Sequence, residues 1–245
     1  MDWHARYIQQ ARWTYQIRRY LFDRAGLDSA RRVLDVGCGT GALLGELPAL
    51  TGAQIHGLDL NLPAAKQAFG NAPTANLVCA DGLTLPYPEA TFDMAFCHFL
   101  LLWVKNPVQV LTEMRRVTKP GGKIAALAEP DYGGRIDHPA PLDELGRWQA
   151  QSLRRQGADT CAGRSLRGWF LKAGITPLET GIIGNGWNDP PPARERELEW
   201  DVICSDLEGF VPGDDIQKMK KLDEHAWVSG ERVLFVPTFY CLGAV

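Results

Sequence analysis

The stretch VLDVGCGTG, residues 33–41, decides the fold of this chain. An apolar run leads into a turn that carries Gly37, Gly39 and Gly41. Such a turn between a buried strand and a helix lets a ligand approach the backbone closely, because glycine has no Cβ in the way. Together with Ala42, the spacing also fits the G-x-G-x-x-A fingerprint of dinucleotide-binding folds. That spacing alone is a weak signal and does not identify the ligand.

Short apolar segments alternate with helical segments on both sides of this turn, which indicates a parallel α/β sheet. The apolar runs predict strands over residues 31–37, 54–60, 76–81, 92–101, 123–130, 175–183 and 232–245. Helices are predicted over residues 3–25, from the glycine turn to about 50, after 61, over 107–117, over 141–173 and within 189–230. Asn61 and Asn106 each precede a first-turn proline and are predicted to cap their helices.

Asp35, two residues before the first glycine, discriminates between two kinds of ligand. A dinucleotide would place its pyrophosphate at this turn, where a nearby carboxylate repels it. S-adenosylmethionine (SAM) has no phosphate and carries a sulfonium and an ammonium group, which a carboxylate attracts. Asp59 ends the second predicted strand, and a carboxylate there can accept both ribose hydroxyls. Dehydrogenases share this second feature, so Asp35 is the residue that favours SAM.

The segment DVGCGTG resembles the SAM-binding turn of class I methyltransferases, particularly the branch that acts on small molecules. Asp59 matches the ribose-binding acid of that family. Asp81 and Gly82, followed by Leu85 and Pro86, resemble its adenine-binding loop. The resemblance therefore implies SAM as cofactor and S-adenosylhomocysteine (SAH) as product.

Two further matches extend the resemblance over about residues 31–130 and the end of the chain. KPGG at 119–122 resembles the turn before the family's fifth strand, and 232–245 resembles its antiparallel last strand. The implied fold is α/β: a doubly wound, mostly parallel, seven-stranded sheet with an antiparallel last strand, an N-terminal helix and a helical cap insert.

We expect a single methyltransferase domain over residues 1–245, because the sequence contains no repeat and no linker. Within it, residues 1–30 are predicted to form an N-terminal helical lid. The Rossmann-like core is predicted over residues 31–183 and 231–245, and a helical cap insert over residues 184–230.

The resemblance implies cofactor contacts from the glycine turn, from the ends of the next strands and from the leading helix. These residues are Asp35, Gly37, Cys38, Gly39, Thr40, Gly41, Asp59, Leu60, Asp81, Gly82, Cys97, Trp13 and Arg18. Arg18 would pair with the SAM carboxylate. On the substrate side we expect Tyr7 from the same helix, Asp131 and Tyr132 after the fifth strand, and Trp200 from the cap.

His98 and His138 are the candidate catalytic bases, and a base is needed only where the acceptor carries a proton. His98 ends an apolar strand and fits equally well as a core histidine. The cap carries Trp187, Trp200 and Trp227, which indicate a flat, apolar or cationic small molecule if they do not simply form the core of the insert.

Charge, cysteine content and apolar runs limit the classes of partner that we expect. The formal net charge is −3, and residues 194–224 hold ten acidic against five basic residues, which disfavours nucleic acid. The six cysteines form no C-x-x-C pair, so we expect reduced thiols, no metal site and a cytoplasmic protein. The longest apolar run, eleven residues from Met94, is too short to span a bilayer, so no membrane partner is expected.

The function predicted from these observations is SAM-dependent methylation of a small organic acceptor by in-line displacement. Three alternatives stay open: a SAM-binding module that acts through a protein partner without catalysis, an RNA or protein methyltransferase, and a nucleotide-dependent oxidoreductase. Residues 1–32, with seven arginines against three aspartates, are the support for an RNA substrate. The sequence leaves the methylated atom and the oligomeric state open.

Overall fold

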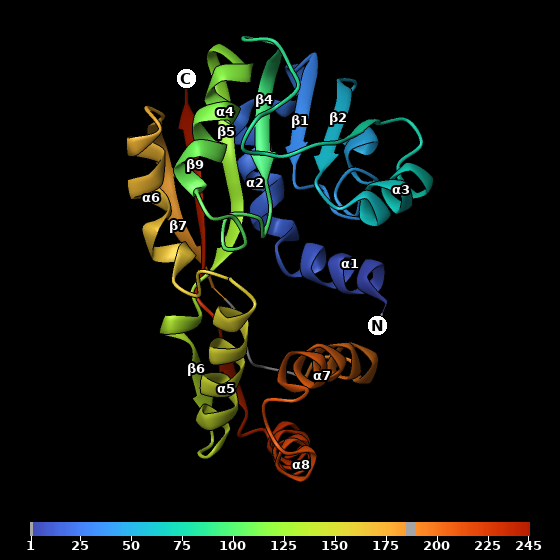
Figure 1. Cartoon of the computed structure of the whole chain (residues 1–245), viewed down its shortest axis with the longest axis vertical. Helices are drawn as coiled ribbons and strands as arrows, with labels where there is room; N and C mark the ends of the chain where they lie inside the picture. Colours follow the sequence, from blue (N-terminus) through green and yellow to red (C-terminus); the bar gives the residue numbers. More distant parts are fainter. Residues whose placement is uncertain (1, 185–189) are drawn as a thin grey trace.

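A seven-stranded sheet forms the centre of the computed structural model, which describes residues 2–184 and 190–245 (Figure 1). The strands lie in the order β3-β2-β1-β4-β5-β9-β7. Neighbouring strands from β3 to β5 are parallel, whereas β9 runs antiparallel to both β5 and β7. The predicted fold class, a mostly parallel seven-stranded sheet with an antiparallel last strand, is confirmed.

The strands are β1 Arg32–Val36, β2 Gln54–Asp59, β3 Asn76–Cys79, β4 Phe92–Cys97, β5 Thr118–Pro130, β6 Ile136–His138, β7 Thr176–Ile183, β8 Val233–Phe235 and β9 Thr238–Ala244. The α-helices are α1 Trp3–Trp13, α2 Tyr15–Ala25, α3 Leu62–Asn71, α4 Pro107–Val117, α5 Leu142–Arg155, α6 Ala162–Lys172, α7 Ala193–Leu207 and α8 Gly213–Ser229. Short 3₁₀ helices are η1 Leu27–Ser29, η2 Leu47–Ala49 and η3 Tyr132–Gly134. No helix in the described ranges is long and apolar enough to cross a membrane.

Helices cover both faces of the sheet, because its central strands are apolar on both sides. In β4, every residue except Asp93 is buried. One face packs against α4 and α6, through Met114 and Phe170 among others. The other face packs against α2, where the rings of Phe22 and Phe96 meet edge to face with centroids 5.3 Å apart. A strand buried on both faces reads as an almost continuous apolar run, which is the pattern that predicts this strand.

The two predicted asparagine caps are confirmed. The Asn61 side chain accepts the N–H of Ala64 at the start of α3, and the Asn106 side chain accepts that of Gln109 at the start of α4. Each bond satisfies one of the backbone donors that the first turn of a helix leaves without a partner. These caps fix where α3 and α4 begin.

The first two predicted helices differ from the structure. The helix predicted over residues 3–25 is two helices, α1 and α2, which meet at Thr14, whose hydroxyl bonds back to the preceding turn. The helix predicted from the glycine turn to Leu50 is wrong, since this segment forms turns and η2. Gly45 and Pro48 interrupt it, and both residue types disfavour a helix interior.

Two later elements also divide. The helix predicted over residues 141–173 is α5 and α6, because Gly157 follows α5 with a left-handed φ of +96°. The strand predicted over residues 232–245 is β8 and β9, separated at Pro237, which cannot donate to a β ladder. β8 pairs instead with β6 in a separate two-stranded sheet, and β6 lies between the predicted elements 123–130 and 141–173.

The predicted cap residues that the structure describes form α7 and α8, and these helices share a small core with α5. Leu145 of α5, Trp200 of α7 and Met219 of α8 belong to this core. Figure 1 shows the cap and the β6–β8 pair below the seven-stranded sheet, with α1 between them. The contacts thus extend the cap beyond residues 184–230, and the division of the chain into lid, core and cap stays a prediction. Trp187 lies outside the described residues.

Candidate functional site

The turn that follows β1 has a shape that glycine adopts without strain. Gly37, Gly39 and Gly41 have φ values of +77°, +53° and +81°. The N–H groups of Gly37 and Cys38 both donate to the carbonyl oxygen of Leu58 at 2.9 Å, which ties the turn to the end of β2. The turn therefore lies at the carboxyl edge of the sheet, where open parallel sheets bind their ligands.

Two predicted ligand carboxylates lie at the same edge. Asp59 ends β2 and accepts the N–H groups of Gly39 and Asn61, each at 2.8 Å. Asp81 follows β3, is exposed, and accepts the N–H of Leu83 at 2.9 Å. A carboxylate offers about four acceptor positions, so both side chains can accept further hydrogen bonds from hydroxyl or amine groups.

Asp35 is buried beside the turn and is only 2% exposed. No hydrogen bond reaches its side chain from the residues that the structure describes. Burial, followed by the negative charge of Asp59, raises the pKa of Asp35 to about 8, although the Arg18 guanidinium acts in the opposite direction. A cation bound at the turn would stabilise this carboxylate. The site therefore fits a positively charged cofactor such as SAM.

Other predicted cofactor residues surround the turn. Leu60 is 69% exposed directly after Asp59. A Cβ on Gly82 would lie 3.4 Å from a methyl group of Val36, so the loop after β3 lies over the end of β1. Cys97 ends β4 beside Val36, and burial raises the pKa of its thiol well above the usual value. The thiol therefore stays protonated, and the cofactor contact expected at Cys97 stays a prediction.

Helix α1 lies across the glycine turn. The Tyr7 ring stands 3.0 Å from the position that a Cβ on Gly39 would take. His4 Nδ1 is 2.8 Å from Thr40 Oγ1, a second contact between α1 and the turn. Burial and the charge of Asp59 raise the pKa of Tyr7, so its phenol stays protonated. The predicted lid thus touches the predicted cofactor turn directly.

Arg18 of α2 is buried and makes several contacts within the protein. Its Nη1 donates to Glu46 at 2.8 Å and its Nη2 to the Ala11 carbonyl at 2.7 Å. Its Nε donates to Thr14 Oγ1 at 3.0 Å, and the same hydroxyl lies 2.9 Å from His98 Nε2. Burial, then the Arg18 charge, lowers the pKa of His98 well below its usual value. Arg18 thus braces α1 and adds to the effect of burial on His98, and its pairing with the cofactor carboxylate stays a prediction.

A cavity of about 380 Å³ lies between α1, the sheet edge and the cap. Three predicted residues line it: Trp13 from α1, Tyr132 after β5 and Trp200 from α7. Burial raises the pKa of Tyr132 to about 12, so its hydroxyl is a donor at neutral pH. A concave apolar pocket with a few polar groups is the usual form of a small-molecule site.

Four other predicted residues, all within the described part of the chain, do not line this cavity. Tyr7 contacts the turn instead, and His98 reaches the cavity only through its bond to Thr14. The carboxylate oxygens of Asp131 accept hydrogen bonds from Arg164 at 2.5 and 2.6 Å, so Asp131 is engaged in an ion pair. His138 is exposed on β6 in the cap, so the structure does not bring it to the glycine turn.

Helix α1 also reaches the cap. Arg6 forms an ion pair with Glu199 of α7. Gln9 donates to the Glu195 carbonyl at 2.9 Å, and Arg12 lies 3.5 Å from the Glu195 carboxylate. These contacts connect residues more than 180 positions apart, so no sequence pattern indicates them. One helix therefore touches both the glycine turn and the cap across the cavity.

Glu129, at the end of β5, is a further site residue that the sequence analysis missed. Its buried carboxylate accepts the N–H groups of Leu100, Leu101 and Leu102, at 3.0, 2.9 and 3.2 Å. Burial raises its pKa to about 7, although the three backbone donors act against this shift. Glu129 holds the loop after β4, in which Phe99 lines the cavity with a φ of +53°.

Comparison with known proteins places this geometry in a family. A methyltransferase domain model matches residues 34–126. The demethylmenaquinone methyltransferase of Renibacterium salmoninarum is 36% identical over 127 residues, which cover 51% of this chain and 52% of that protein. The malonyl-[acyl-carrier protein] O-methyltransferase of Pseudescherichia vulneris is 33% identical over 177 residues, which cover 70% of this chain and 67% of that protein. The chain thus spans about half the length of the first of these relatives.

A solved structure shows the same fold. The geranyl diphosphate C-methyltransferase from Streptomyces coelicolor, in complex with Mg²⁺, geranyl diphosphate and SAH, has a TM-score of 0.59 at 14% identity. The match covers 94% of this chain and 76% of that one. Taken with the relatives above, the glycine turn and the sheet order show that the chain belongs to the class I SAM-dependent methyltransferase family.

Proposed function

We propose that this protein binds SAM at the glycine turn and transfers its methyl group to a small organic acceptor in the adjoining cavity. The observation that carries this proposal is that α1 contacts the glycine turn and also lines the cavity. Tyr7 contacts the turn, and Trp13 lines the cavity six residues further along the helix. Relatives named for demethylmenaquinone and geranyl diphosphate support a small acceptor.

Each carboxylate at the sheet edge has a role in this proposal. Bound SAM supplies an electrophilic methyl group on a sulfonium, and SAH is the product. The Asp35 carboxylate faces the positive part of the cofactor, for which a buried side chain without a hydrogen-bond partner among the described residues is suited. Asp59 accepts the ribose hydroxyls, and Asp81 accepts the amine of the adenine.

Orientation, rather than proton removal, is the main contribution of the protein in this proposal. The cavity is lined by α1 on one side and by the cap on the other, so an acceptor bound there is held between them. Holding two reactants in line contributes roughly 7–11 kcal/mol in favourable cases. The lowered pKa of His98 makes it a weak base that reaches the cavity only through Thr14. We place His138 outside the reaction.

Titration of the purified protein with SAM, SAH and NAD by calorimetry tests the cofactor site. We expect micromolar binding of SAM and SAH, no binding of NAD, and loss of binding in Asp59→Ala. Asp28→Ala, which changes an exposed aspartate outside the site, is the matched control and keeps full affinity. Binding of NAD without SAM would refute the proposed cofactor. Binding of SAM without methyl turnover on any acceptor in a screen would favour the non-catalytic module.

A further inference from the structure

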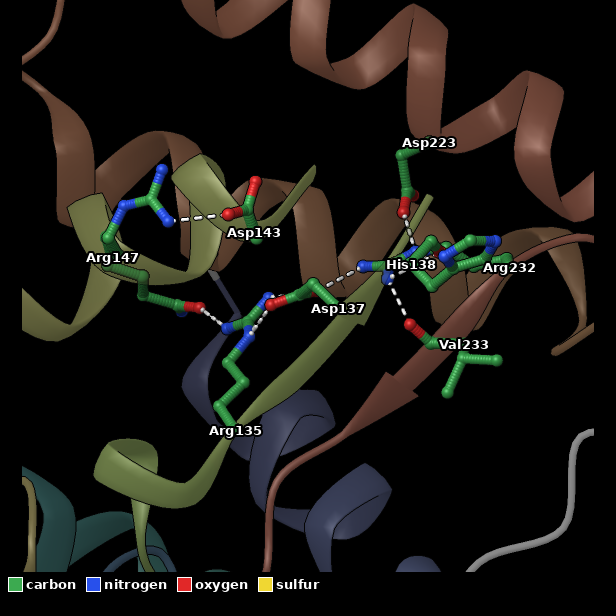
Figure 2. Close-up of polar contacts among 9 residues, drawn as sticks. Arg135, Asp137, His138, Asp143, Arg147, Asp223, Arg232 and Val233 are labelled. Atoms are coloured by element: carbon green, nitrogen blue, oxygen red, sulfur yellow. Dashed lines mark hydrogen bonds and ion pairs between the residues drawn. The ribbon is translucent and has the colours of Figure 1, made fainter. Parts of the chain in front are cut away.

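A buried network of two arginines and two carboxylates lies at the cap end of the cavity (Figure 2). Arg232, just before β8, donates from Nε to Asp223 of α8 at 2.6 Å and from Nη2 to Asp137 of β6 at 2.7 Å. Arg135 donates from Nε to the other oxygen of Asp137 at 2.6 Å. The side chains of Arg135, Asp137 and Arg232 are only 6%, 2% and 1% exposed. Both arginines and Asp223 nevertheless line the cavity.

The N–H groups of Arg232 are almost all used. A guanidinium has five N–H groups, and a buried one without an acceptor is unfavourable. Besides Asp223 and Asp137, Arg232 Nη1 donates to the carbonyl oxygens of Val233 at 2.5 Å and His138 at 3.4 Å (Figure 2). One N–H, on Nη2, is left without an acceptor among the described residues.

Arg135 has more donor capacity to spare. It directs two N–H groups to Asp137 and one, from Nη1, to Gln149 at 2.6 Å. Its remaining two N–H groups, on Nη1 and Nη2, have no acceptor in residues 2–184 and 190–245. The Nη2 atoms of Arg135 and Arg232 lie 3.2 and 2.7 Å from the same oxygen of Asp137. Both Nη2 atoms thus meet at one carboxylate oxygen and each keeps a spare N–H group, so the pair can serve a ligand with two acceptor oxygens.

The other charges of the cavity also favour an anion. Every carboxylate among the described lining residues already has an arginine partner, and the pairs are Glu199–Arg6, Glu195–Arg12 and Asp223–Arg232. Arg196 lines the cavity and has no ion pair within the described ranges. A cationic ligand would have to compete with an arginine for its carboxylate, whereas an anionic ligand finds donors that are free.

The rest of the lining is suited to an apolar body. Its aromatic residues are Trp13, Phe99, Tyr132, Trp200 and Trp227. Trp13 of α1 and Phe99 of the loop after β4 lie beside the sheet edge, whereas Trp200 and Trp227 belong to the cap. An elongated molecule with one acidic end would therefore lie along these rings, with its acid at the Arg135–Arg232 network.

We propose that the acceptor is an organic acid with an apolar or aromatic body, and that Arg135 and Arg232 bind its carboxylate. This inference rests on the proposed function, because it makes the cavity the acceptor site. The network lies in the cap, away from the glycine turn, so the carboxylate is an anchor and is not the group that is methylated (Figure 1). The methyl-accepting atom is at the opposite end of the molecule, beside α1.

The test compares three ligands of one shape: indole-3-propionate, indole-3-propionamide and tryptamine, which differ in charge. We expect calorimetry to show the carboxylate binding at least about tenfold more tightly than the amide, the difference that a charge-assisted pair supplies. Arg135→Gln removes this preference, and Asp137 keeps Arg232 as its partner in that variant. Arg135→Lys keeps the positive charge but loses the planar guanidinium that can bind two oxygens at once. We expect it to retain part of the preference, which separates a loss of binding from a loss of folding.

Arg147→Gln is the matched control, because Arg147 of α5 pairs with Asp143 and does not line the cavity, and we expect it to keep the preference. Arg196→Gln measures the contribution of the other cavity arginine. Equal binding of acid and amide, preference for tryptamine, no binding of any of the three, or dependence on Arg196 alone would overturn the assignment. SAH is titrated into the same samples. Preference for the acid without SAH binding would support the anion site and contradict the proposed function. SAH binding without preference for the acid would contradict the anion site alone.

Discussion

The Tyr7 ring lies against Gly39, with its Cε2 atom 3.0 Å from the position of a Cβ on that glycine. The lid helix and the glycine turn are therefore in direct contact across a space with no room for a side chain. Any ligand that approaches the turn meets both groups, so changes on either side of this contact should affect cofactor affinity.

Gly39→Ala tests the turn side of that contact. At a φ of +53°, alanine is strained by about 1–2 kcal/mol, and its methyl group would press on the Tyr7 ring. We expect SAH affinity to fall by about tenfold or more and thermal unfolding to occur at a lower temperature. Gly52→Ala, where a Cβ meets open space, should change neither quantity. Equal effects of the two substitutions would show that the turn has no special role.

Removal of residues 1–10 tests the lid side. This change removes Tyr7 but keeps α2, whose Leu21 and Phe22 are buried in the sheet core and are needed for folding. We expect the shortened protein to remain folded and to unfold cooperatively, at a lower temperature because the cap loses its contacts with Arg6 and Gln9, and to bind SAH much more weakly. SAH affinity that is unchanged in calorimetry would exclude α1 as part of the cofactor site.

We predict that Asp35 releases a proton when the cofactor binds. Its pKa of about 8 in the free protein means that it is largely protonated at pH 7, and a bound cation lowers that pKa. Calorimetry at pH 7 in buffers of different ionisation enthalpy should detect the released proton with SAM. The release should disappear well above pH 8, where the free carboxylate is already ionised, and in Asp35→Asn at any pH. Release that persists in this variant would assign the proton to another group.

The same shift has a consequence for stability. Because the pKa of Asp35 is raised in the folded state, the folded protein holds a proton that the unfolded chain gives up above the ordinary carboxyl range. The contribution of Asp35 to folding therefore falls as pH rises toward 8 and is constant above it. Denaturant unfolding of Asp35→Asn should show a weaker decrease with pH over this range than the unchanged protein. Parallel pH profiles would contradict the shift.

At Gly146, α5 packs closely on the arginine network. A Cβ there would lie 2.4 Å from Asp137 Oδ2 and 2.9 Å from Arg135 Nε. Gly146→Ala should therefore destabilise the cap, although alanine favours helices by up to about 1 kcal/mol over glycine. Gly168→Ala, in the exposed middle of α6 with open space around it, should stabilise the protein by that amount. Urea unfolding measures the stability of both variants. If Gly146→Ala also stabilised the protein, the arginine network would have to move aside at little cost in free energy.

The fold and the cofactor turn were predictable because their signals are local. The glycines at 37, 39 and 41 and the carboxylate of Asp35 lie within seven residues, and each strand is a short apolar run. Asn61 and Asn106 cap their helices through bonds to backbone groups three residues away. Parallel strands then bring the ends of β1, β2 and β3 to one edge, so the candidate cofactor residues follow from topology.

The acceptor side depended on contacts between distant segments. Arg232 meets Asp137 across 95 residues, and Glu129 meets Leu100 across 29 residues. No local pattern distinguishes these charged residues from solvated ones, because their burial and pairing arise only when the cap closes over the sheet edge. Backbone preference and apolar periodicity thus encode the strands, the caps and the glycine turn along the chain. The packing of α1, the sheet and the cap creates the cavity and its charges, since burial and electrostatic pairing are properties of neighbours in space.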